Sequence, residues 1–225
     1  ISKYQGFVDK FIGDAIMVLF SLPEESNSTE ALNTVQAAIE MQQQVDFFNQ
    51  DQDNELWEPL RVGIGIHSGP VIIGTVGSEE RMESTVTGDS VNLAARLEGL
   101  TKYYRSRIIV SQSTYEFLES ENSLEFRELD LVQVKGKEQP VTIYEVCNSD
   151  PEPLREQKLK NLDKFAEGLK NFRARKWGKA MTRFKSCLKD CPDDGAAEIF
   201  LERCKIFQKT PPSQNWVGEH IFELK

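Results

Sequence analysis

The hydrophobic pattern of the chain changes once, close to residue 147. Before that point, short apolar runs that alternate like strands are interspersed with longer runs at helical spacing. After the polar stretch 148–153, which contains two prolines, only helical spacing is found. Strands and helices mixed in this order predict an α+β fold, with one mixed sheet and helices on one face, followed by an all-helical part.

The expected elements of the first part include three hairpins and three helices. Gly13 and Asp14 sit at the turn of the first hairpin, where a glycine allows a tight reversal. The expected ranges are a hairpin of Gly6–Phe11 and Ala15–Phe20, a helix Ser28–Asn49, a strand Arg61–His67 that returns through Val71–Val76, a charged loop Gly77–Glu83, a helix Asp89–Leu100, a strand Arg107–Val110, a short helix Ser113–Leu118 and a hairpin of Phe126–Val134 and Val141–Cys147.

The second part predicts amphipathic helices joined by short turns, a pattern typical of helix-hairpin repeats. The expected helices are Leu159–Ala174, Trp177–Lys189 and Gly195–Gln208, and Pro211-Pro212 ends the helical part. We therefore expect a first domain over residues 1–147, a linker over 148–156 and a helical tail over 157–225.

The expected strand Arg61–His67 has glycines at alternate positions. Side chains of a strand alternate between faces, so Gly63 and Gly65 leave one face almost bare while Ile64 and Ile66 point into a core. A bare face is tolerated where a ligand or another backbone must approach closely, and a plain bulge or bend is an equal alternative.

Composition excludes several classes of protein. The net charge of −9 disfavours a general nucleic-acid binder, because phosphate binding needs a basic surface. No apolar run reaches the length of a membrane span, and the first residues have no signal-peptide pattern. The four cysteines are expected to be reduced, buried thiols, and two histidines make a zinc site improbable. We expect a cytoplasmic chain, and any membrane tether would lie upstream of residue 1.

Three short motifs could carry chemistry. Asp14 at the tip of the first hairpin, with Lys10 before it, could hold a hard cation such as Mg²⁺. Asn92 and Arg96 lie four residues apart on one helix face and could grip a ribose and a phosphate. Lys135 and Lys137 flank a glycine in a turn that could fold over an anion. Each motif in isolation also fits a solvated turn or a polar surface stripe. For a single motif, such a turn or stripe without a ligand is the commoner case.

In their order and in their residues, these blocks resemble the catalytic domain of class III nucleotidyl cyclases, most closely the bacterial adenylate cyclases. The resemblance covers roughly residues 1–147, through the blocks Gly6–Met17, Arg61–Gly69, Glu80–Met82 leading into Thr85–Glu98, and Val134–Lys137. The second part resembles the tetratricopeptide-like tail that often follows such domains in bacteria.

The resemblance implies a ferredoxin-like βαββαβ core that works as a homodimer with active sites between the chains. It implies two Mg²⁺ or Mn²⁺ ions per site, held by two aspartates. Asp14 matches the second of these, and the first lies in the family on a strand that would precede Ile1. We therefore expect an N-terminally truncated domain.

Individual positions also transfer from the resemblance. Lys10 and Thr85 match the residues that read the base, Asn92 the residue that positions the ribose, Arg96 the transition-state arginine and Lys135 the phosphate-binding lysine. Adenine offers an acceptor at N1 and a donor at N6, which suits a lysine donor and a hydroxyl acceptor. The resemblance thus implies conversion of ATP to 3′,5′-cyclic AMP and pyrophosphate, for intracellular signalling.

Other functions stay open at this point. The chain could be an inactive cyclase-like module that serves dimerisation or regulation, or a guanylate cyclase. It could also be an interaction protein in which the helical tail binds a protein partner.

Overall fold

The computed structural model describes residues 1–225 apart from 21–26, 51–57, 79–80, 135–138 and 223–225. The first part runs through a 3-10 turn Ser2–Tyr4, β1 (Phe7–Ile12), β2 (Ala15–Leu19), α1 (Asn27–Gln50), β3 (Ile64–Ile66), β4 (Ile72–Ser78), β5 (Arg81–Thr87), α2 (Asp89–Tyr104), β6 (Ile108–Ser111), α3 (Gln112–Glu116), β7 (Phe126–Val134) and β8 (Val141–Val146). The second part contains a 3-10 turn Cys147–Ser149, α4 (Leu154–Lys160), α5 (Leu162–Arg173), α6 (Trp177–Asp190), α7 (Gly195–Lys209) and β9 (His220–Phe222).

The predicted α+β class with a mixed sheet is confirmed. The main sheet has the strand order β3-β6-β8-β7-β9, in which β3 runs parallel to β6, β9 runs parallel to β7 and the other pairs are antiparallel. The β1–β2 and β4–β5 hairpins form separate two-stranded sheets, so the prediction of a single sheet is corrected. In the part of the chain that the structure describes, no further strand lies between β2 and β3 to join these two sheets by hydrogen bonds.

The predicted return of Arg61–His67 through Val71–Val76 is wrong. Only Ile64–Ile66 forms a strand, and its partner is β6, more than forty residues further along the chain. The segment Ile72–Ser78 pairs instead with Arg81–Thr87, most of which was expected to be a charged loop or the approach to a helix. Local alternation identifies a strand but not its partner, because parallel pairing depends on contacts that are distant in sequence.

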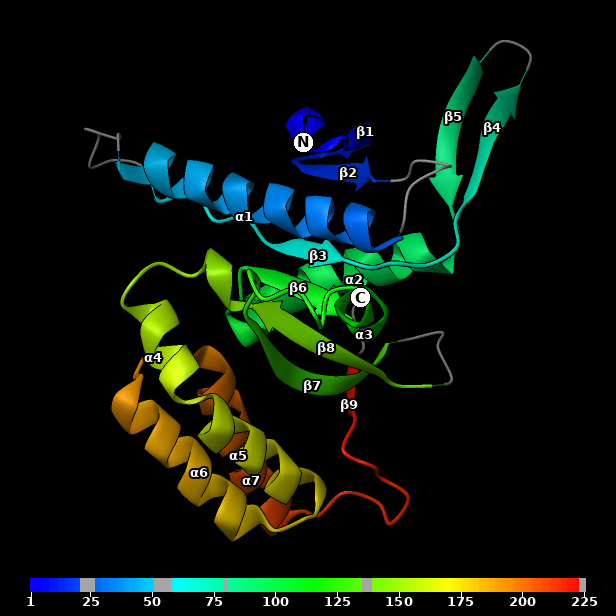
Figure 1. The fold of residues 1–225 in the computed structure, drawn as a ribbon. Helices are drawn as coiled ribbons and strands as arrows, with labels where there is room; N and C mark the ends of the chain where they lie inside the picture. The colour runs from blue at the N-terminus through cyan, green and yellow to red at the C-terminus, as the bar shows by residue number, and fades with distance from the viewer. Residues whose placement is uncertain (21–26, 51–57, 79–80, 135–138, 223–225) are drawn as a thin grey trace.

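Helices cover both faces of the main sheet, which corrects the prediction of one covered face. Successive residues of β6 alternate between two hydrophobic clusters: Ile108 and Val110 pack with Val35 of α1, whereas Ile109 packs with Leu97 of α2. Figure 1 shows α1 on one side of the main sheet and the tail helices α5, α6 and α7 on the other. The alternation of side chains along a fully buried strand requires this arrangement.

The glycine face of β3 is occupied by α2 of the same chain. A Cβ atom built on Gly65 would lie 2.2 Å from the backbone nitrogen of Glu98 and 2.4 Å from the carbonyl oxygen of Ala94. A Cβ on Gly63 would lie 2.0 Å from the hydroxyl of Thr101. Of the alternatives that the sequence left open, close approach of another backbone is therefore the one observed.

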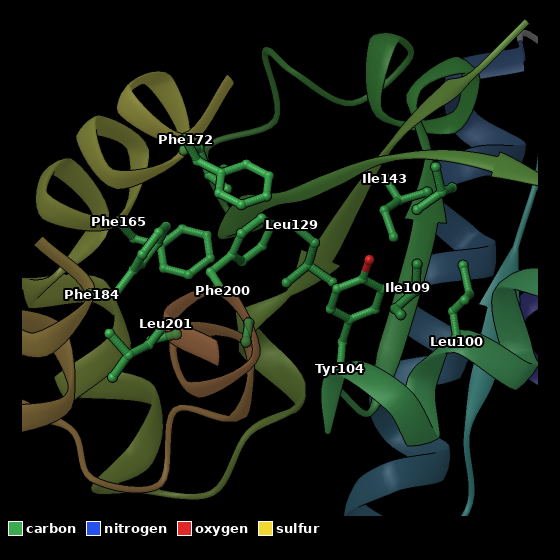
Figure 2. Close-up of a cluster of buried hydrophobic side chains, with 14 of the residues drawn as sticks. Leu100, Tyr104, Ile109, Leu129, Ile143, Phe165, Phe172, Phe184, Phe200 and Leu201 are labelled. Atoms are coloured by element: carbon green, nitrogen blue, oxygen red, sulfur yellow. The ribbon is translucent and has the colours of Figure 1, made fainter. Parts of the chain in front are cut away.

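The helical tail shares its hydrophobic core with the first part of the chain. Figure 2 shows the tail phenylalanines of α5, α6 and α7 meeting Leu129 of β7, with Tyr104 of α2 between them and the sheet residues Ile109 and Ile143. Phe165, Phe172, Phe184 and Phe200 are each completely buried. Burial of each such side chain contributes about 2–3 kcal/mol, so the tail stabilises the sheet that it covers.

Two features of the tail differ from the sequence prediction. The expected helix Leu159–Ala174 is divided at Asn161, a fully buried residue whose side-chain amide donates to the Cys187 carbonyl of α6. The strand β9 was not predicted, because three residues after a proline-rich segment carry no periodicity. The four cysteines are free and buried, as predicted. No helix among the described residues is long and apolar enough to span a membrane.

Candidate active site

The first hairpin places Lys10 and Asp14 where the sequence predicted. Gly13 adopts a φ of 63° at the turn, a left-handed conformation that glycine accepts without a steric penalty, and Asp14 follows it on the exposed tip. Among the described residues, Asp14 makes no side-chain hydrogen bond or ion pair. Its carboxylate is thus accessible to a ligand from solvent.

A residue beside Lys10 was missed by the sequence analysis. The pairing of β1 with β2 is irregular between Val8 and Lys10, so that Asp9 lies at a bulge. At a bulge, consecutive side chains can turn toward the same side. The ammonium nitrogen of Lys10 lies 3.5 Å from a carboxylate oxygen of Asp9, whose side chain is only 6% exposed. Strict alternation along the strand would place these two neighbouring side chains on opposite faces, so it did not predict the ion pair.

The third and fourth predicted residues, Asn92 and Arg96, lie on α2. Leu93, Leu97 and Leu100 of the same helix are buried against the sheet, and Asn92 and Arg96 lie one position before the first two of them. Asn92 is exposed and Arg96 is half-buried, and neither side chain has a hydrogen bond or ion pair within the described ranges. Both are available to a ligand.

The start of α2 is held to the β4–β5 hairpin. Gly88 precedes the helix with a φ of 136° and provides no side-chain cap. The hydroxyl of Ser90 donates to the Pro70 carbonyl over 2.7 Å, just before β4 begins. Thr85 lies three residues before Gly88 on β5, where its backbone pairs with Gly74. The predicted base-reading position is thereby close in sequence to the helix that carries Asn92.

The remaining predicted residue, Lys135, lies outside the described residues, directly after the end of β7. The described residues contain no group of three or more histidine, cysteine, aspartate or glutamate side chains that could by itself hold a metal ion. Asp14 therefore offers a single carboxylate. Mg²⁺ is commonly bound in this way, through one or two carboxylates together with phosphate oxygens of a substrate and water.

Large apolar side chains are exposed on both hairpins. Phe11 of β1 is 76% exposed and Ile72 of β4 is 70% exposed, and Phe7, Ile12 and Ile73 are also exposed. Each hairpin thus presents apolar surface to solvent.

Solved structures show the same fold. The adenylyl cyclase CyaB from P. aeruginosa aligns with a TM-score of 0.58 and 32% identity, over 68% of this chain and 76% of that one. The guanylyl cyclase Cya2 aligns with a TM-score of 0.54 and 34% identity, over 68% of this chain and 74% of that one. The α+β part thus has the fold of a nucleotidyl cyclase.

The sequence comparisons give the family. Residues 4–147 match the family described as adenylate and guanylate cyclase catalytic domain, and the chain belongs to it. An adenylate cyclase of Anabaena cylindrica is 45% identical over 151 residues, which are 65% of this chain and 29% of the relative. The terminal-differentiation specific adenylate cyclase of Dictyostelium discoideum is 40% identical over 205 residues, 91% of this chain and 10% of the relative.

The alignment with the Dictyostelium protein is longer than the family match and so continues into the helical tail. The chain spans about a tenth of that protein and less than a third of the Anabaena enzyme.

Proposed function

We propose that this chain is the catalytic part of an adenylate cyclase, which converts ATP to 3′,5′-cyclic AMP and pyrophosphate. The observation that carries the proposal is the set of Lys10, Asp14, Asn92 and Arg96, which occurs in the order of the family on two accessible elements. The adenylate cyclases among its relatives support the choice of ATP. Residues 1–147 would form the catalytic domain, and the tail over 157–225, which we compare with tetratricopeptide repeats, would follow a linker over 148–156.

Lys10 is the residue that favours adenine. An ammonium group donates hydrogen bonds and cannot accept them, so it suits the N1 acceptor of adenine and not the N1–H of guanine. The Asp9 carboxylate lies 3.5 Å from the ammonium and would restrain the lysine, which would lower the entropy lost on binding a base. Thr85, as a hydroxyl acceptor for the adenine amino group, completes the proposed readout.

The reaction that we propose is an in-line attack of the ribose 3′-hydroxyl on the α-phosphorus. Asn92 would position the ribose, and the guanidinium of Arg96 would neutralise charge on the phosphate oxygens as the bond to pyrophosphate breaks. Lys135, which follows β7 in the sequence, would bind the phosphates. Asp14 would hold Mg²⁺ or Mn²⁺, two ions per site, and such ions make a hydroxyl more acidic and polarise phosphoryl oxygens.

We further propose that the site is shared between the subunits of a homodimer. Asp14 and Arg96 lie on different elements and make no contact with each other within the described residues, so each is free to complete a site with a partner's residue. The exposed Phe11 and Ile72 supply apolar surface for such an interface. A dimer would also bury Phe7 and Phe11, which the monomer leaves exposed to water.

The test is the product formed by the full-length protein from equal concentrations of ATP and GTP with Mg²⁺ or Mn²⁺. We expect cyclic AMP as the main product, and Lys10→Glu should abolish this preference. Lys179→Glu makes the same charge change at an exposed position of α6 and should leave it unaltered. Cyclic GMP as the dominant product would contradict the assignment of the base, and no cyclic nucleotide at all would favour an inactive regulatory module.

A further inference from the structure

The last turn of α2 is held by the helical tail from two sides. Asn92 and Arg96 lie in the first half of this helix, and Tyr103 and Tyr104 lie at its end. A helix rises 1.5 Å per residue, so Arg96 and Tyr103 are about 10 Å apart along the axis. With two turns between them, a rigid helix transmits a displacement of one end to the other.

The first hold is a buried polar chain across three elements. The Tyr104 hydroxyl donates to a carboxylate oxygen of Asp130 on β7 over 2.7 Å, and Arg203 of α7 forms an ion pair with the same oxygen. All three residues are at least 95% buried. Burial and the Asp130 charge raise the pKa of Tyr104 well above its usual range, so the phenol keeps the proton that it donates.

Arg203 is itself fixed by aromatic rings. The centre of its guanidinium lies 4.8 Å from the ring centroid of Phe172 and 4.7 Å from that of Phe200. Two of its nitrogens have no hydrogen-bond partner among the described residues, so the planar group is held by the rings and by one carboxylate. Lysine cannot reproduce this contact, because its ammonium is not planar and does not stack on rings.

The second hold comes from β9. The imidazole of His220 stacks on Tyr103 with centroids 5.4 Å apart, and Phe222 meets the same ring edge-to-face at 4.8 Å. Tyr103 is seven positions after Arg96, which places both on one side of the helix. In Figure 1, the chain end that contains β9 lies along β7 beside this part of the sheet.

From these contacts we infer that Arg203 is a positioning residue for catalysis, which acts through Asp130 and Tyr104 to fix the helix that carries Asn92 and Arg96. The inference rests on the proposed function. It assigns the tail a role beyond stability: the geometry of the active site requires the link from Arg203 of α7 through Asp130 to Tyr104. The similarity to the Dictyostelium enzyme, which continues into the tail, agrees with a tail that is part of the catalytic unit.

The chain offers a matched control for Arg203. Arg127 on β7 is also a buried arginine, also pairs with an aspartate across the boundary between sheet and tail, here Asp194, and also lies over a phenylalanine, Phe165 at 4.2 Å. Its ionic partners are on β8 and at the start of α7, and among the described residues it makes no hydrogen bond, ion pair or ring contact with α2. Arg203→Lys and Arg127→Lys therefore make the same chemical change. Only Arg203 is connected to the catalytic helix through Asp130 and Tyr104.

The experiment compares these variants in the full-length protein, below the temperature at which either unfolds. We expect Arg203→Lys to lower kcat at least tenfold while KM for ATP changes less than threefold, and to speed amide hydrogen exchange along residues 89–97. Arg127→Lys should leave kcat within about twofold and exchange in that segment unchanged. Tyr104→Phe removes one hydroxyl, keeps the ring packing, and should reproduce Arg203→Lys if the latter fails to fold.

Two results would overturn the inference. In one, Arg203→Lys and Tyr104→Phe lose stability but keep both kcat and the slow exchange of α2. In the other, both arginine variants lower kcat in proportion to their loss of stability, which would show general destabilisation. If the unaltered protein forms no cyclic nucleotide, the proposed function fails, whereas the hydrogen exchange of α2 still decides whether Arg203 controls the helix.

Discussion

Gly65→Ala should disable the site without changing any residue in it. The added methyl group would lie 2.2 Å from the Glu98 nitrogen, 2.4 Å from the Ala94 oxygen and 2.8 Å from the Leu97 carbon, all of them backbone atoms of α2. Backbone cannot rotate away as a flexible side chain can. To restore ordinary contact at 3.4 Å or more, α2 must retreat from β3 by about 1 Å.

The consequences can be given in magnitude. Overpacking of a well-packed core costs about 1–3 kcal/mol, and the rigid neighbours here place the loss in the free energy of unfolding near the upper end. A displacement of about 1 Å in a positioning element can lower a rate about 100-fold. We therefore expect kcat for cyclic AMP formation to fall by one to two orders of magnitude in protein that is still folded.

The assay pairs urea denaturation, followed by tryptophan fluorescence, with initial rates of cyclic AMP formation. Gly178→Ala is the control, because a Cβ at this exposed position of α6 meets nothing within 4 Å. It should raise stability by up to about 1 kcal/mol, since alanine is the better helix former, and leave the rate unaltered. Parental stability and activity in Gly65→Ala would refute the close packing of α2 on β3.

Three further predictions concern the dimer, the pH response and the boundary between sheet and tail. Asp14→Ala and Arg96→Ala should each be inactive. A mixture that exchanges subunits should recover roughly a quarter of the parental rate, because a mixed dimer keeps one intact site. An inactive mixture with proven exchange would place both residues in a site formed by a single chain. Burial, followed by the charge of Arg203, lowers the pKa of His220 to about 4. The free energy of unfolding should therefore be complete above pH 6.5 and fall as the pH drops from 6.5 toward 4, by about 1 kcal/mol at pH 5.5. His220→Gln should flatten that dependence in urea titrations. Asp194→Asn leaves the buried Arg127 with one carboxylate fewer and should cost about 3 kcal/mol in the same titrations, and a loss below 1 kcal/mol would contradict the buried pair.

The elements with strong local signals were predictable from the sequence. The first hairpin, the long helix α1, the last hairpin and the tail helices α6 and α7 lie within a few residues of their predicted bounds. In each, the periodicity of apolar residues or a Gly-Asp turn selects the local conformation without help from distant residues. The places of Lys10 and Asp14 on a hairpin, and of Asn92 and Arg96 on one helix face, follow from the same local rules.

Only the tertiary structure decided which elements meet. The partner of β3 is β6 and the glycine face of β3 receives α2, since pairing and face covering depend on contacts far apart in the chain. The bulge at Asp9 and the three-residue strand β9 have no periodic pattern to reveal them. The link from Arg203 through Asp130 to Tyr104 joins residues from three elements, which become neighbours only when the tail docks on the sheet and buries their charges together.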